Sequence, residues 1–169
     1  MYEGHSVVRE GAIAGAIGAS AVAVWFLVVD IIAGEPLYTP ALLGRALFSL
    51  FGPVPAGETA ALHIVGYTIF HFAAFVAVGM LVVRMVHWAH SEPSVLAGFL
   101  MLFVAFQLGF YGFVTLLAQQ DVLGALAWWQ IGAANLIAAL FMGIYIWRTH
   151  PALWTELSHT LEGGERRGE

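Results

Sequence analysis

Residues 61–83 read ALHIVGYTIFHFAAFVAVGMLVV, and this stretch decides the fold class because it contains no charged side chain. A helix needs about 20 predominantly apolar residues to cross the hydrocarbon core of a bilayer, and the stretch supplies them. An isolated segment in lipid can satisfy its backbone hydrogen-bonding groups only as a helix. We therefore predict a transmembrane helix over 59–86.

Three further stretches are long and apolar enough to span a bilayer, namely 11–33, 94–118 and 124–147. The first has its small-residue positions before its most hydrophobic part, which is the reverse of a cleavable signal peptide. We interpret it as an uncleaved anchor. The expected fold is an all-α polytopic membrane protein, a four-transmembrane-helix bundle that forms one domain over 1–169.

Composition leads to the same class. Hydrophobic residues make up 60 % of the chain and charged residues 10 %, with a mean hydropathy of +0.84, whereas about a quarter of a soluble domain is charged. The six basic residues are all arginines, and they form no patch for a nucleic-acid backbone. The chain has no cysteine, which excludes disulfides, thiolate metal sites and covalently attached haem. We expect as partners the lipid bilayer and either other membrane protein subunits or further copies of this chain in a homo-oligomer, and no nucleic acid.

The arginines also predict the orientation. Only Arg45 falls on one side of the predicted spans. The other side carries Arg9, Arg84, Arg148, Arg166 and Arg167. Because positive residues accumulate in cytoplasmic segments, the N- and C-termini are both expected in the cytoplasm.

Two short amphipathic helices are expected at the membrane surfaces, over about 40–51 and 151–161. The first is introduced by Thr39-Pro40 and stopped by Gly52-Pro53. A shallow re-entrant loop is the alternative for this segment. The second follows Pro151 and lies on the cytoplasmic side.

Two segments carry a family resemblance. The stretch WFLVVDIIAGEPLYTPALLG at 25–44 and the stretch WRTHPAL at 147–153 resemble segments of bacterial four-helix inner-membrane proteins. The resemblance implies a bacterial inner (cytoplasmic) membrane, and it implies no activity.

Polar residues within the spans gather at two depths. Counted inward from the non-cytoplasmic ends of the spans, a central layer lies near the bilayer midplane and contains His71, Gln107 and Asn135. An outer layer contains Asp30, His63, Tyr67, Tyr111, Thr115 and Gln130. Four-residue spacing places His63, Tyr67 and His71 on one helix face, which we expect to point into the bundle. Gln130 and Asn135 are about 140° apart on a helix, so we expect Asn135 rather than Gln130 to face inward.

The layers have three interpretations. Polar side chains bond across helices and specify which helices meet. An ionisable group within a span also marks ion or proton paths, and His71 is the only titratable residue in the central layer. Thirdly, His71 could ligate a haem or a chlorophyll-type pigment through one ring nitrogen. We predict no cofactor and keep the third interpretation open.

Other candidate sites are weaker. His87 and His90 lie three residues apart on one helix face and are the best candidates for metal ligands, although we predict no metal site. Asp30 and His63 form the nearest approach to an acid–base pair, and we find no catalytic constellation. The chain is therefore not expected to be an enzyme.

Small residues recur at helical spacing in two spans and predict close helix packing. They are Gly11, Gly15 and Gly18 in the first span and Gly98, Ala105 and Gly112 in the third. The glycine side of the first span faces either another span of the same chain or another subunit.

The expected function follows from the lack of an extramembrane domain and of self-sufficient chemistry. It is that of a non-catalytic accessory subunit of a larger bacterial membrane complex, respiratory or photosynthetic. The alternative is a small oligomeric channel or transporter that uses the central layer, and a single-histidine haem- or pigment-binding protein comes third.

Overall fold

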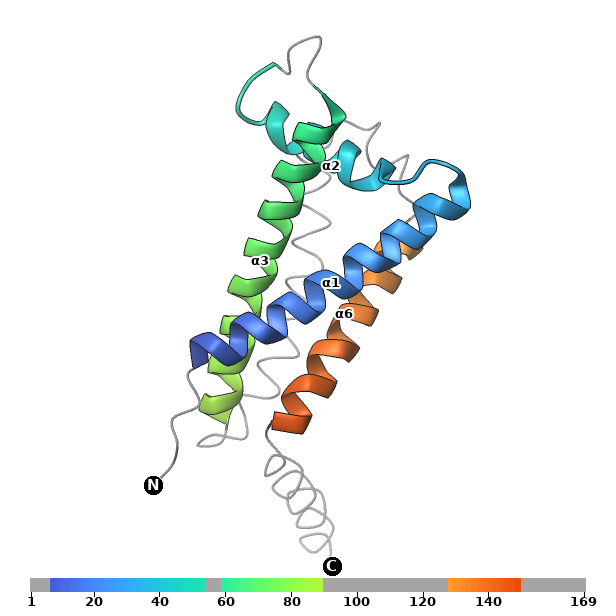
Figure 1. Cartoon of the computed structure of the whole chain (residues 1–169). Coiled ribbons are helices and arrows are strands. Elements are labelled where there is room, and N and C mark those ends of the chain that lie inside the picture. The colour runs from blue at the N-terminus through green and yellow to red at the C-terminus, as the bar shows by residue number, and fades with distance from the viewer. Residues whose placement is uncertain (1–6, 54–58, 90–127, 150–169) are drawn as a thin grey trace, which may run out of the picture.

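The computed structural model describes residues 7–53, 59–89 and 128–149. In this part of the chain the elements are all helices: α1 (Val7–Ala33), α2 (Tyr38–Ser49), α3 (Ala60–Ala89) and α6 (Trp128–Thr149) (Figure 1). Helices α1, α3 and α6 are each long and apolar enough to cross a membrane. At 1.5 Å per residue they extend roughly 40, 45 and 33 Å, against about 30 Å for a bilayer core. The described part of the chain is all-helical, and its long apolar helices are those of a membrane protein.

Three of the four predicted spans correspond to these long helices. The start of α1 differs most, since the helix begins at Val7 and includes Arg9 and Glu10, which we expected to precede the span. The predicted span at 94–118 and the predicted surface helix at 151–161 lie outside the described residues.

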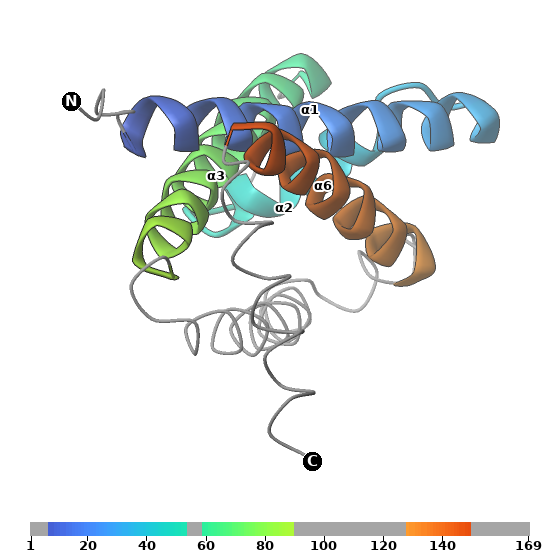
Figure 2. The same ribbon diagram turned by 90° about the horizontal axis from the view of Figure 1, so that it is seen from below.

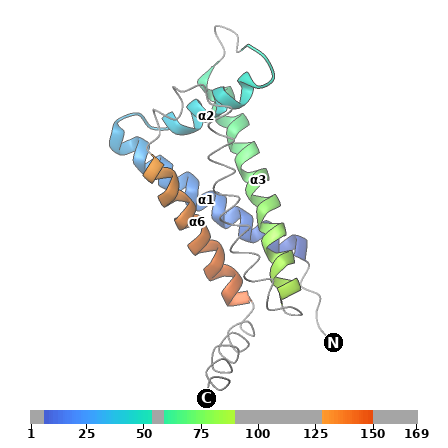
Figure 3. The same cartoon turned by 180° about the vertical axis from the view of Figure 1, so that it is seen from behind.

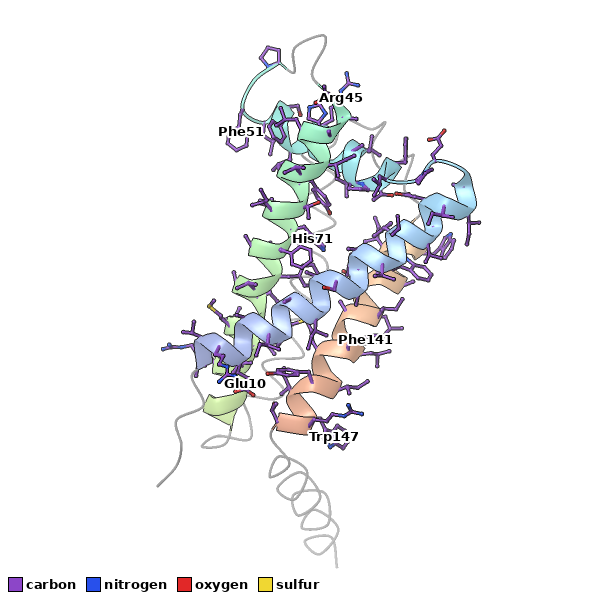
Figure 4. All side chains as sticks on the ribbon, in the orientation of Figure 1. Glu10, Arg45, Phe51, His71, Phe141 and Trp147 are labelled. Carbon is purple, nitrogen blue, oxygen red and sulfur yellow. The ribbon has the colours of Figure 1, made fainter. Side chains whose placement is uncertain are left out.

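Helix α1 runs obliquely across α3 and α6 and is antiparallel to both (Figures 1 and 2). Its N-terminal end lies beside the C-terminal ends of α3 and α6, and we call this end of the molecule the Glu10 end (Figure 4). At the opposite end, α1 diverges from α3 and α2 lies between them (Figure 3). We call this the α2 end.

Two small apolar clusters hold α1 in place. One joins Ala14 of α1 to Val83 of α3 and to Met142 and Ile146 of α6. The other joins Val22 of α1 to Ala134 and Ala138 of α6. The buried residues of α1 include Ala14, Gly18 and Val22, which recur every four residues and therefore lie on one helix face.

The end of α1 is a Schellman turn. The amide of Gly34 donates to the Ile31 carbonyl at 3.1 Å, and the amide of Glu35 donates to the Asp30 carbonyl at 3.0 Å. Gly34 has φ +82°, a conformation that glycine adopts without the clash of a Cβ atom. This turn reverses the chain toward α2.

Helix α2 begins at Tyr38, two residues before the predicted start, so Pro40 is its third residue instead of its first. Leu37 precedes the helix with φ 69° and its side chain supplies no capping hydrogen bond. The cap comes instead from Asp30 of α1, which accepts a hydrogen bond from the Thr39 amide at 2.9 Å. A capping group outside the segment explains why the local sequence misplaced the start.

Helix α2 packs on the first turns of α3. A Cβ atom on Gly44 would collide with the backbone of His63, and a Cβ atom on Gly66 would collide with the ring of Phe48. Both glycines therefore permit a close approach of the two helices. Helix α2 thus bridges the diverging ends of α1 and α3.

Candidate functional site

His71 lies on α3 close to the point where α1 crosses it, and its side chain points toward α1 (Figure 4). The ring atom Nε2 is 3.1 Å from the backbone carbonyl oxygen of Ala19, and the side chain is 9 % exposed. A carbonyl oxygen only accepts hydrogen bonds, so Nε2 carries the hydrogen in this contact. His71 thus ties α3 directly to the backbone of α1.

Aromatic rings surround this imidazole. Tyr67 stacks on it with ring centroids 5.6 Å apart, and Phe75 lies 4.8 Å away in a tilted arrangement. Phe72 meets the ring edge at 5.9 Å. The structure therefore brings the predicted residues His71 and Tyr67 together, one turn apart on α3.

The ring has one nitrogen left for other chemistry. Because Nε2 donates to Ala19, an iron or magnesium ion at Nε2 would have to displace this hydrogen bond. The other nitrogen, Nδ1, makes no hydrogen bond with the part of the chain that the structure describes. A metal ligand or a transferred proton would therefore use Nδ1 if the contact with α1 is kept.

The other members of the central layer fall on different parts of the chain. Asn135 is half-buried on α6, and it is not without an interaction partner. Gln107 lies outside the described residues, as do Tyr111 and Thr115 of the outer layer. The layer as a three-residue arrangement stays a prediction.

Asp30, from the outer layer, is used within the chain. It is buried, and its carboxylate accepts hydrogen bonds from the Thr39 amide at 2.9 Å and from the Thr39 hydroxyl at 2.7 Å. His63 is also buried, and its ring contacts that of Phe48 edge to face, with 5.4 Å between the centroids. Through these hydrogen bonds, Asp30 caps the start of α2.

Gln130 contributes its backbone. Its carbonyl oxygen accepts a hydrogen bond from the indole nitrogen of Trp25 at 3.0 Å, and Trp25 meets Trp129 edge to face at 6.4 Å. Aromatic side chains of this kind are common near membrane interfaces. These contacts join the α2 end of α1 to the start of α6.

Sequence reasoning missed a polar contact at the Glu10 end. The Glu10 carboxylate is 3 % exposed, and its Oε1 accepts a hydrogen bond from the Thr149 hydroxyl of α6 at 2.9 Å. A signal was present, because Glu10 stands four residues before Ala14 and eight before Gly18, on the face that α1 buries. A charged residue on that face indicates a buried carboxylate.

The glycine face of α1 packs against the same chain. A Cβ atom on Gly11 would collide with the backbone of Met80, one on Gly15 with Phe75 and Val76, and one on Gly18 with Met142. The partner side of α3 has its own glycine, Gly79. The other three predicted packing residues, Gly98, Ala105 and Gly112, lie outside the described residues.

The two candidate metal ligands cannot be located in the structure. His90 and the side chain of His87 lie outside the described part of the chain. Within that part, no group of three or more His, Cys, Asp or Glu residues could hold a metal ion.

No protein-family model, curated protein or solved structure matches this chain. The resemblance to bacterial four-helix inner-membrane proteins therefore stays a prediction.

Proposed function

We propose that this chain is a non-catalytic accessory subunit of a larger complex in a bacterial inner membrane. The observation that carries the proposal is the contact of His71 with Ala19, because it uses the buried imidazole to hold two helices together. A group that serves as a helix-to-helix link needs no substrate to explain its burial.

The other polar contacts across the described helices have the same character. Trp25 bonds to Gln130, Asp30 to Thr39 and Glu10 to Thr149, and every one of these pairs joins two elements of this chain. Such bonds contribute about 0.6 kcal/mol each on average in membrane bundles. These hydrogen bonds favour a rigid scaffold that neighbouring proteins contact over a polar pathway for ions or protons.

Exposed apolar side chains supply the surface that such a role needs. Along α6 they include Leu136, Leu140, Phe141, Ile144 and Trp147. Lipid tails and the helices of another subunit both satisfy such a face. Contact with further membrane subunits, or with copies of this chain, belongs to the proposal.

The topology is also proposed. Helix α3 ends at the Glu10 end and α6 begins at the α2 end (Figures 1 and 3). In a bilayer, the connection between them has to cross an odd number of times, which the predicted span at 94–118 would supply. The resulting four spans place both termini on one side, and the arginine distribution favours the cytoplasm.

A second candidate, a small oligomeric transporter, is favoured by one observation: Nδ1 of His71 makes no hydrogen bond to a described residue. This nitrogen could accept a proton within the span. The same atom would serve the third candidate, a pigment or haem ligand, since Nε2 is engaged by α1.

Purification from native membranes in a gentle detergent tests the proposal. The co-purifying proteins and the visible absorption spectrum are recorded on the same fraction. We expect colourless preparations with stoichiometric partner proteins. A solitary colourless oligomer would favour transport, and an absorption band that the His71→Leu variant loses would favour pigment or haem binding.

A further inference from the structure

Besides Arg9 of α1, two arginines lie at the Glu10 end, one on α3 and one on α6. Arg84 is in the last part of α3, and Arg148 is in the last turn of α6. Both side chains are exposed, and neither makes a hydrogen bond or an ion pair with a described residue. Within the described residues, no carboxylate neutralises these two charges.

The packing shows that the two arginines lie at a similar level. Thr149, next to Arg148, is bonded to Glu10 of α1. Val83, next to Arg84, belongs to the cluster that includes Ala14 and Ile146, against which Val7 of α1 packs. Arg84 and Arg148 therefore lie at the level of the first turns of α1.

A bilayer places this level at the headgroups. The candidate spans end at Met85 on α3 and at Thr149 on α6. The two arginines are therefore at the ends of the spans, where long basic side chains reach the interface. Trp147 is exposed beside Arg148 (Figure 4), and tryptophan prefers the same level. The one carboxylate that the described residues add at this end, Glu10, is buried.

We propose that Arg84 and Arg148 bind the phosphate groups of anionic lipids at the Glu10 end of the protein. Guanidinium donors match phosphate oxygens in geometry as well as in charge. The proposal rests on the membrane embedding of the chain and not on the accessory-subunit role.

The test uses the full chain and measures lipid binding by native mass spectrometry, with phosphatidylglycerol competing against phosphatidylcholine. An arginine near a lipid surface contributes roughly a fivefold preference for the anionic lipid, so the Arg84→Gln, Arg148→Gln double variant should lose about 25-fold. Added salt should lower the wild-type preference, because the contacts are exposed.

The matched control is Arg45→Gln. Arg45 is also exposed and makes no hydrogen bond or ion pair with a described residue, but it is on α2 at the opposite end (Figure 4). In detergent both ends are accessible to added lipid, so this control separates a site from overall charge. We expect it to retain the wild-type preference.

Three results would overturn the proposal. They are a wild type without preference for phosphatidylglycerol, an unchanged preference in the double variant, and an equal loss in Arg45→Gln. Thermal unfolding of each variant shows that the fold is retained, as expected for exposed side chains.

Discussion

The carboxylate of Asp30, near the end of α1, holds both the amide and the hydroxyl of Thr39 in the first turn of α2, at 2.9 and 2.7 Å. All three groups are buried. Because α2 packs in turn on α3, this pair of bonds connects the three elements that diverge at the α2 end. Asp30 is therefore expected to stabilise the arrangement of α1 and α3 from a distance.

Replacement of Thr39 by Val should destabilise the protein by about 1 to 3 kcal/mol, because a buried carboxylate oxygen loses its donor. The matched control is Thr68→Val, since the Thr68 hydroxyl bonds only to its own helix, at the Ile64 carbonyl, and is exposed. The measurement is chemical unfolding in detergent micelles. Equal stability of the two variants would contradict a stabilising role of the Thr39 hydroxyl bond to Asp30, whereas the amide bond that caps α2 is kept in both.

Gly15→Ala should cost about 1 to 3 kcal/mol, because the added Cβ atom would collide with the backbone of Phe75 and Val76, which can shift only by moving α3. Gly143→Ala makes the same chemical change on α6, where no described atom lies within 4 Å of the added carbon. It should cost nothing or stabilise the helix by up to about 1 kcal/mol. Unfolding curves that shift equally for both would contradict the close crossing of α1 and α3.

Reporter fusions test the orientation. A reporter fused at Gly168, or inserted after Ser91, should be active in the cytoplasm, and one near Gly57 should be active in the periplasm. The reason is the five-to-one distribution of arginines across the predicted spans. A periplasmic reporter at Gly168 would refute that count.

The membrane class and three long helices could be predicted from the sequence because apolar length is a local property. The end of α1 at Ala33 agreed, since Gly34 gives a local stop signal. Helix α1 begins at Val7, four residues before the predicted span, and the buried Glu10 of its first turns bonds to Thr149, which lies 139 residues away. The spacing of Glu10 from Ala14 and Gly18 indicates that it is buried, but nothing near it in the sequence identifies Thr149 as its partner.

The candidate site was predictable to a similar degree. Four-residue spacing correctly placed Tyr67 and His71 on one face, because helical periodicity determines it. The partner of His71 was not predictable, since a backbone carbonyl such as that of Ala19 has no side-chain signature. Asp30 was grouped with His63 by depth alone, although its hydrogen bonds go to Thr39, which is nearby in the chain.

The central claim is that His71 links α1 to α3 and does not carry protons. The direct measurement is dissipation of a pH gradient in proteoliposomes that contain the wild type or His71→Gln, with unfolding recorded on the same preparations. Glutamine keeps a donor for the Ala19 carbonyl but cannot titrate near neutral pH. We predict no proton flux above that of empty liposomes for either protein, and a loss of stability of about 0.5 to 2 kcal/mol in the variant. A wild-type flux that His71→Gln abolishes without any change in unfolding would contradict the account.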